Sequence, residues 1–166
     1  MAAVTTLPAA FVANTVLTAD QLNNLRGAFR TLQVVAVSST TAVATTSTSF
    51  VTSGLSTSIT PSSSSSKILV QVTFPFDSSS GGTQAHGTLF RGTVAGTNLA
   101  AGGDPTTGNI LGTGQLRGTY TASFLDSPAT TSATTYTVGI KVSTGTTLTA
   151  MINGSTGTLV VSEISA

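Results

Sequence analysis

The stretch KILVQVTFPF, residues 67–76, decides the fold class. Its apolar residues occupy alternate positions, as a strand with one buried face requires. The residues on that face are Ile68, Val70, Val72, Phe74 and Phe76. Pro75 inside the run predicts a sheet edge, a bulge or a strand end, because proline has no N–H to donate to a ladder.

The same period of two residues recurs from Gln33 onward. Further apolar faces run from Tyr120 to Phe124, from Tyr136 to Val142 and from Leu148 to Ile152. In TLVVSEIS, residues 158–165, apolar residues fall on both faces, which predicts a strand covered on both sides. Many short strands separated by Gly, Pro, Ser and Asp turns indicate an antiparallel, jelly-roll-like β-sandwich.

Two short motifs between these runs predict turns. The pair Asn153–Gly154 matches a glycosylation pattern, but it is also the commonest pair in a tight hairpin, and the hairpin turn is the prediction. The serine-rich stretch 60–66 is too short to link two domains. The strands therefore belong to one domain.

The chain before Gln33 has a different period and predicts one short helix, residues 18–30. Thr18 is a suitable N-cap with Gln21 completing a capping box, and the charges of Asp20 and Arg30 suit the helix dipole. An apolar stripe follows the helical spacing through Leu22, Leu25 and Phe29, with Leu32 as a further candidate.

A lone helix of this length is marginal in water, so its stripe must rest on another surface. Two alternatives stay open: the helix covers its own domain, or it anchors the chain to a partner. We divide the chain into a docking segment, 1–32, and a β-sandwich, 33–166. The expected docking residues are Phe11, Val16, Leu22, Leu25 and Phe29.

The composition narrows the functional classes. Only 7% of the 166 residues are charged and the formal net charge is +1, too little for the cationic surface that phosphate backbones require. No apolar stretch approaches the length of a membrane-spanning helix, and the N-terminal stretch lacks the basic residues of a signal peptide. The chain has no cysteine, which fits synthesis in the cytoplasm. We expect neither nucleic acid nor a membrane as partner, and we expect permanent assembly, because sparse charge gives little colloidal protection.

No residue pattern predicts catalysis, a cofactor or a metal. His86 is the one histidine, and general-base or metal chemistry would need carboxylates converging on it. A polar position at the surface or in an interface is its expected role, although three symmetry-related copies could build a site at a threefold axis. The stretch 112–114 lacks the spacing of a dinucleotide fingerprint, and no serine lies in a nucleophile elbow.

Four segments together resemble small structural proteins of tailed bacteriophages, of the minor tail or fibre-like kind. They are TVLTADQLNNLRGAFRTLQVV, TSTSFVTSGLSTSITPSSSSSKILVQVTF, LDSPATTSATTYTVGIKV and NGSTGTLVVSEIS. The resemblance spans Thr15 to Ser165 and rests on motifs of low complexity. It implies a sandwich similar to the trimeric knob of fibres, with an N-terminal attachment segment. Fewer than forty residues precede the sandwich, which departs from long fibres with a shaft and favours a short appendage or a capsid decoration protein.

The sequence therefore predicts a non-enzymatic bacteriophage virion structural protein, made in the host cytoplasm and incorporated into the virion. It is expected to be a homotrimer that binds other tail or capsid proteins, and a host surface glycan or protein is a further possible partner. The alternative is a capsid decoration, or cement, protein that stabilises the head. A third hypothesis, a secreted carbohydrate-binding module or adhesin, is weakened by the absence of tryptophan and of an export signal.

Overall fold

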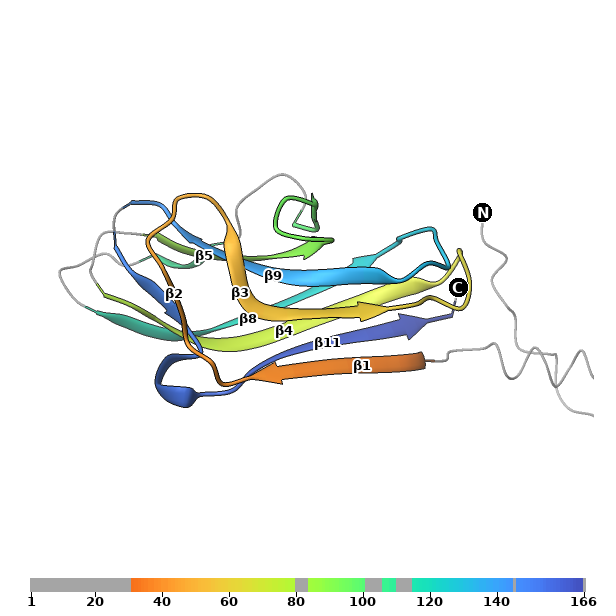
Figure 1. Cartoon of the computed structure of the whole chain (residues 1–166), viewed down its shortest axis with the longest axis horizontal. Helices are drawn as coiled ribbons and strands as arrows, with labels where there is room; N and C mark the ends of the chain where they lie inside the picture. The colour runs from red at the N-terminus through yellow and green to blue at the C-terminus, as the bar shows by residue number, and fades with distance from the viewer. Residues whose placement is uncertain (1–30, 80–83, 101–105, 110–114, 145, 166) are drawn as a thin grey trace, which may run out of the picture.

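A computed structural model describes residues 31–79, 84–100, 106–109, 115–144 and 146–165. The expected helix and all five expected docking residues lie outside these ranges. The described chain consists of antiparallel strands and one 3-10 turn (Figure 1). The strands are β1 (Thr31–Ser39), β2 (Val43–Thr45), β3 (Val51–Ile59), β4 (Lys67–Ser78), β5 (Gln84–Arg91), β6 (Thr97–Asn98), β7 (Thr106–Asn109), β8 (Leu116–Asp126), β9 (Thr134–Val142), β10 (Leu148–Ala150) and β11 (Gly157–Ile164).

The strands form two sheets packed face to face. In the six-stranded sheet β4 pairs with β8 on one side and with β11 and β10 on the other, and β1 and β2 complete the outer positions. In the five-stranded sheet the order is β3-β9-β5-β6, with β7 also paired to β5. Four long strands, β1-β11-β4-β8, thus face a second set, β3-β9-β5-β6, and the chain crosses between the sheets as in a jelly roll. The prediction of a mainly β, jelly-roll-like sandwich is confirmed.

The inner faces of both sheets make one core, as the period of two predicts. All five alternate residues of β4 are buried, and so are Tyr136, Val138, Ile140 and Val142 on β9. Phe74 packs on Tyr120 with ring centroids 5.1 Å apart. Phe124 is only half-buried, because β8 is an edge strand whose inner side chains are covered less completely than those of β4.

Pro75 occupies a place that the sequence prediction did not include. It lies within β4, paired with Thr119 of β8 on one side. On the other side β11 pairs with β4 up to Thr73 and β10 begins at Phe76, so Pro75 sits at the junction of two neighbouring strands. Its carbonyl accepts a hydrogen bond from the Met151 N–H at 2.8 Å. The missing N–H therefore falls where the neighbouring strand is interrupted.

The Asn153–Gly154 turn forms, but it does not close a hairpin. Asn153 and Gly154 both have positive φ angles, 55° and 73°, in the 3-10 turn Ile152–Gly154. The strands on either side, β10 and β11, pair with successive parts of β4 and not with each other. The turn therefore makes an excursion between two strands that lie end to end.

Two further expectations about strand faces are wrong. Leu32 lies in β1, not on a helix, and its side chain is exposed. In β11 only one face is fully covered: Leu159 and Val161 are buried, whereas Val160 and Ile164 are half-exposed. Two-sided burial was predicted because both faces carry apolar residues, and the structure leaves the outer ones at the surface.

Candidate functional site

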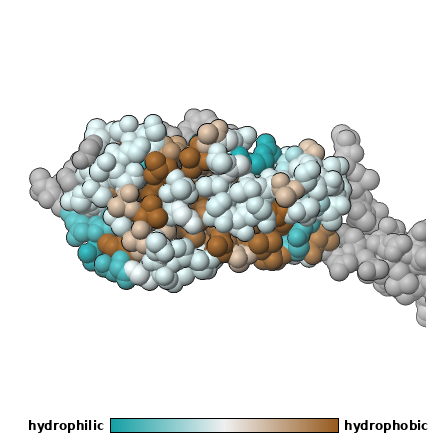
Figure 2. All heavy atoms as spheres, viewed as in Figure 1, coloured by the Kyte–Doolittle hydropathy of each residue, from teal (hydrophilic) through white to brown (hydrophobic). Residues whose placement is uncertain are grey.

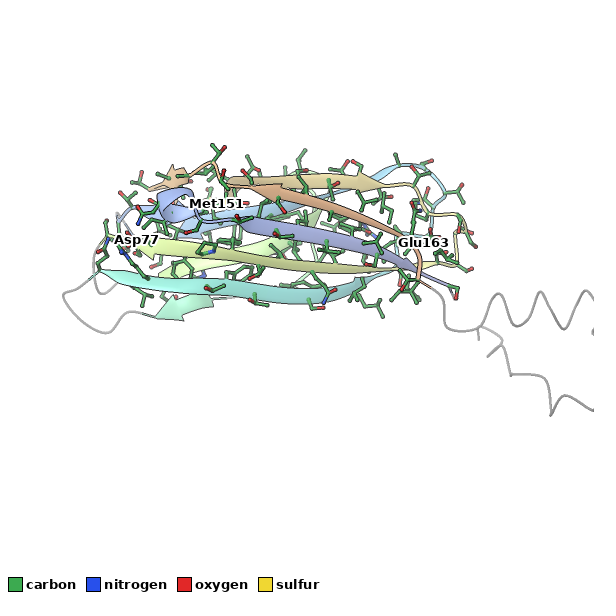
Figure 3. All side chains as sticks on the ribbon, turned by 90° about the horizontal axis from the view of Figure 1, so that it is seen from below. Asp77, Met151 and Glu163 are labelled. Carbon is green, nitrogen blue, oxygen red and sulfur yellow. The ribbon has the colours of Figure 1, made fainter. Side chains whose placement is uncertain are left out.

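The most unusual surface of the described chain is the outer face of the six-stranded sheet. Four neighbouring strands, β1, β11, β4 and β8, lie side by side there (Figure 3). Each contributes three outward positions without a charge, and we name this set the uncharged face. It consists of Val34, Ala36 and Ser38; Thr158, Val160 and Ser162; Leu69, Gln71 and Thr73; and Thr121, Ser123 and Leu125.

Strand register arranges these residues in rows across the sheet. One row runs Val34, Ser162, Leu69, Leu125, and the next Ala36, Val160, Gln71, Ser123. The first row carries most of the exposed apolar surface: the side chain of Val34 is 58% exposed and that of Leu125 is 62% exposed. The partly exposed Leu69 lies next to Leu125 in this row, so the aliphatic surface is continuous over two strands, as in a surface that a partner covers.

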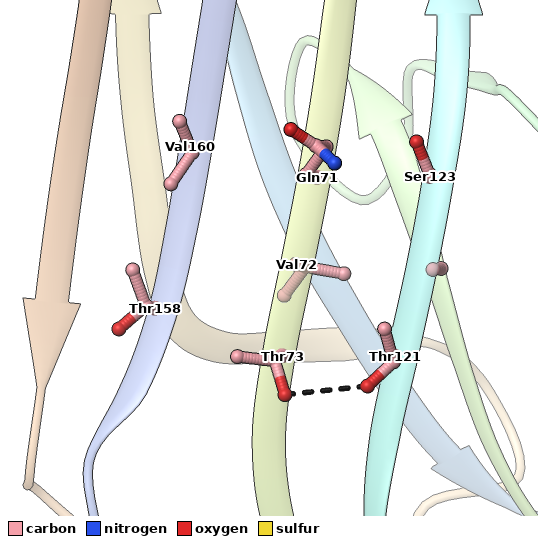
Figure 4. Close-up of a pocket in the computed structure, with 8 residues that line it drawn as sticks. Gln71, Val72, Thr73, Thr121, Ser123, Thr158 and Val160 are labelled. Carbon is pink, nitrogen blue, oxygen red and sulfur yellow. Dashed lines mark hydrogen bonds between the residues drawn. The ribbon is translucent and has the colours of Figure 1, made fainter.

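The third row is a line of hydroxyl groups. Ser38 and Thr158 form a hydrogen bond with oxygens 3.0 Å apart, and Thr73 and Thr121 form another at 3.3 Å. Beside this row the sheet is hollowed into a depression of about 300 Å³ between β11, β4 and β8 (Figure 4). Its lining includes the aliphatic side chain of Val160 and the polar side chains of Gln71 and Ser123. The uncharged face therefore offers aliphatic contact along one row and hydrogen-bonding groups along another.

Among the described residues, charged groups on this side of the sheet lie at its two ends. Lys67 begins β4 and donates to the Ser127 hydroxyl at 2.7 Å. At the opposite end, Arg117 approaches Asp77 with nitrogen and oxygen 3.8 Å apart. Figure 2 looks at the edge of the sandwich, and there too weakly polar and apolar surface predominates and strongly hydrophilic patches are few. A partner can therefore cover the middle of the sheet without desolvating a charge.

The five-stranded sheet differs because its own side chains cover it. Phe50 packs edge-on against Phe90 with centroids 5.3 Å apart, and the Lys141 ammonium lies 4.7 Å from the Phe50 ring centre. The whole interior of β5 is buried on both sides, including Thr88, whose hydroxyl donates to Asn98 at 2.8 Å. This sheet offers no comparable open face within the described ranges.

A buried carboxylate fixes the end of the uncharged face where β1 begins. Glu163 of β11 is fully buried and accepts hydrogen bonds of 2.7 Å from the backbone N–H and hydroxyl of Ser62 and from the Gln33 amide. Burial opposes its ionisation, but the hydrogen bonds from Ser62, Ser66 and Gln33 outweigh burial and lower its pKa from 4.5 to about 2. The serine-rich loop between β3 and β4 is thereby fastened to β11.

A second polar cluster joins the two sheets at the same end. Asp126 of β8 accepts hydrogen bonds from the Arg91 guanidinium at 3.2 Å and from the Tyr136 hydroxyl at 2.8 Å. Burial, together with the hydrogen bond to Asp126, raises the pKa of Tyr136. Burial alone raises the pKa of Tyr120 to about 12. Both tyrosines are thus neutral structural groups and not exposed platforms.

The residues that the sequence singled out for chemistry do not converge. His86 is buried in β5 at 5% exposure, so the expected surface position is wrong. It is buried because outward side chains of β5 are covered, which the alternation of the strand alone does not reveal. The described ranges contain no group of three potential metal ligands and no helix suited to crossing a membrane. Residues 112–114 lie outside them.

Sequence reasoning missed the uncharged face because it searched for the buried side of each strand. The signal was present in KILVQVTF, where the positions between the core residues are Leu69, Gln71 and Thr73. In a soluble monomer, charged side chains are expected at such outward positions. Their absence from four adjacent strands becomes visible only once the strand order is known.

Comparisons with known proteins give similarity in structure only. No family model matches the chain, and no curated protein matches it. Three solved structures from infectious bursal disease virus are similar over most of this chain, each with a TM-score of 0.44. They are the virus Gx strain (14% identity, covering 81% of this chain and 38% of that one), the Gt strain (16%, 82% and 39%) and the VP2 subviral particle (16%, 81% and 37%). The chain therefore spans less than two fifths of the length of each of these proteins.

Proposed function

We propose that this protein is a non-enzymatic structural component of a bacteriophage virion, present in many copies at the particle surface as a short tail or fibre-type appendage. The observation that carries the proposal is the uncharged face. Its exposed Val34 and Leu125, with no charge between them, match the charge-depleted centre of a protein interface better than the surface of a monomer. Jelly-roll sandwiches are also a recurrent architecture of viral capsid and lectin domains.

The two ends of the sandwich differ in the chain segments that they carry. The start of β1 and the end of β11 are paired, Thr31 with Ile164, so the N-terminal segment enters at one end of the sandwich (Figure 1). The turn Ile152–Gly154 and the end of β4 lie at the opposite end. We propose that residues 1–32 dock on the particle through Phe11, Val16, Leu22, Leu25 and Phe29, and that the opposite end faces outward.

Self-assembly as a homotrimer is part of the proposal. Sparse charge and an open apolar sheet favour permanent contact between copies. If the outward loops also bind a host glycan or surface protein, three or more copies would raise the avidity of a weak site through effective concentration.

A capsid decoration protein is the second candidate, and the same uncharged face favours it, because added interface area is what stabilises a shell. Electron microscopy of native particles labelled for this chain separates the two, since label appears either on the head or on the tail. A secreted carbohydrate-binding module is less well supported, because Tyr120 and Tyr136 are buried and cannot stack on a sugar.

The test is removal of residues 1–30, which leaves β1 intact. We expect the truncated chain to fold, to form trimers by light scattering and to be absent from purified particles. Substitution of Phe29 by Glu in the full chain should also prevent incorporation, whereas Asn24→Glu, on the opposite side of the expected helix, should not. Incorporation of the truncated chain at normal copy number would overturn the docking assignment, and a monodisperse monomer at micromolar concentration would overturn the trimer.

A further inference from the structure

We propose that the uncharged face of one copy is the acceptor for residues 18–30 of a second copy, so that neighbouring copies exchange their N-terminal segments. This inference rests on the proposed function, in which that segment docks, and it names the surface on which it docks. A partner of this kind accounts for two features together: the exposed aliphatic residues of the sheet face, and the apolar stripe of Leu22, Leu25 and Phe29 that the sequence predicts.

The uncharged face has the width that the segment requires. From Val34 on β1 to Leu125 on β8 there are three strand spacings, about 14 Å in all. A helix over residues 18–30 is about 20 Å long, and its stripe from Leu22 to Phe29 covers about 10 Å. The stripe can therefore lie across most of the distance between Val34 and Leu125, and it would pass beside the depression lined by Val160 and Gln71.

The chemistry of the two surfaces also agrees. The middle of the face carries aliphatic and hydroxyl groups and the amide of Gln71, so the stripe meets no charge that would be stripped of water. On a helix, Asp20 lies on the side away from Leu22 and Phe29 and remains in solvent. Arg26 lies beside the stripe, four residues after Leu22 and three before Phe29, and its long side chain lets the guanidinium extend into solvent. An apolar stripe resting on an uncharged sheet leaves no buried charge unpaired.

The position of β1 favours the sheet of a second copy, and not the chain's own sheet, as the acceptor of the helix. β1 begins at Thr31, immediately after the expected end of the helix at Arg30. To lie on its own sheet, the helix would have to reverse direction with no connecting residues. Connections between helices and strands usually take about 2–6 residues. A neighbouring copy places no such constraint on the connection.

The natural absence of cysteine makes the test direct, because every disulfide formed is an engineered one. Full chains carrying Leu22→Cys or Phe29→Cys are mixed with full chains carrying Leu125→Cys and oxidised. One of these two mixtures, depending on the direction in which the helix crosses, should give a product of twice the chain mass on a non-reducing gel. Asn24→Cys is the matched control for the opposite helix side and should give little product.

Oxidation of a single chain that carries both cysteines of the productive pair then distinguishes two arrangements: the segment lies on a neighbouring copy (exchange), or it lies on its own sheet (self-covering). Exchange gives covalent dimers and larger products, whereas self-covering gives only a monomer of altered mobility, which would overturn the proposal. Equal cross-linking from Asn24→Cys would also overturn it. If no cross-link forms while the truncated chain still fails to join particles, the segment docks on another virion protein: the proposed function then stands and this inference fails.

A second measurement does not depend on disulfide geometry. Leu125→Lys changes a residue that is already exposed, so the fold should survive. Association of trimers of the full chain into larger assemblies, which the exchanged segments would join, should weaken about tenfold or more. Ser58→Lys, on the exposed edge strand β3 of the other sheet, is the matched control and should leave self-association unchanged. Equal association of the Leu125→Lys and unsubstituted chains would overturn the proposal.

Discussion

Glu163 is a buried acid whose role is to hold a loop. Its two carboxylate oxygens divide their partners: one accepts from Ser62 and the other from Gln33, which in turn donates to the Thr60 carbonyl at 2.6 Å. The carboxylate thus joins β1, β11 and the loop after β3. Because a pKa of about 2 lies below the ordinary 4.5, the folded state favours the ionised form.

Substitution Glu163→Gln should lower the free energy of unfolding at pH 7 by about 1 to 3 kcal/mol, because an amide places an N–H opposite one of these donors. The sign of the pH dependence follows from the lowered pKa: the stabilisation is complete above about pH 4.5 and disappears as the pH falls toward 2. Urea unfolding of both proteins from pH 7 to pH 2 measures it. The two curves should converge at low pH, and a constant difference across this range would contradict the role of ionisation.

Among the elements, β8 is the least protected edge. It pairs with β4 over its whole length without a register shift, and from Gly118 to Leu125 it carries no charge and no proline. By contrast, the edge strand β3 has a register shift next to Gly54, whose φ is 87°, and β1 has one near Gln33. An unbroken, uncharged edge is a template for unwanted strand pairing.

A lysine on β8 should therefore slow aggregation. Thr119→Lys lies on the exposed side of β8 outside the uncharged face, and it should change the free energy of unfolding by less than about 0.5 kcal/mol. Light scattering of concentrated protein near its unfolding temperature should show slower growth for this variant than for Ser58→Lys on the interrupted strand β3. Equal slowing by both variants would mean that added charge, and not the β8 edge, controls aggregation.

The strands could be predicted from the sequence wherever apolar residues occupy strictly alternate positions, because such a strand buries one face. β4 and β9 were predicted because one side of each faces the core. Phe124 and His86 were predicted less well, because their exposure depends on which strands are neighbours, which alternation does not reveal. The uncharged face was missed for the same reason, since it exists only through the order of four strands that are distant in the sequence. The expected helix and its docking residues stay predictions.

At the scale of the whole molecule, the scarcity of charge leaves little electrostatic stabilisation for salt to screen. Arg91–Asp126 and Arg117–Asp77 are ion pairs between described residues, and the formal net charge is +1. Exposed pairs contribute at most about 1 kcal/mol each, and screening acts mainly on such groups. Burial of apolar surface is therefore the main source of both folding and association.

Raising NaCl from low concentration to about 1 M should change the free energy of unfolding by less than about 2 kcal/mol. Particles washed in the same salt should retain the protein, because an uncharged contact has no attraction for salt to screen. Sodium sulfate should instead raise stability, since it strengthens apolar burial. Urea unfolding and gels of washed particles check both points, and loss of the protein from particles in 1 M NaCl would show that charge mediates docking.

The pairing of β1 with β11 has a consequence for biosynthesis. Thr31 leaves the ribosome more than a hundred residues before its partner Ile164, a delay of about 7 to 27 s at ~5–20 residues per second. Throughout this interval the six-stranded sheet lacks one of its four long strands, so the surface proposed to accept another copy's N-terminal segment does not yet exist. The segment is thus translated before its acceptor is complete. A nascent chain that does not yet contain β11 cannot capture a neighbour through this surface, and assembly is deferred until β11 has been translated.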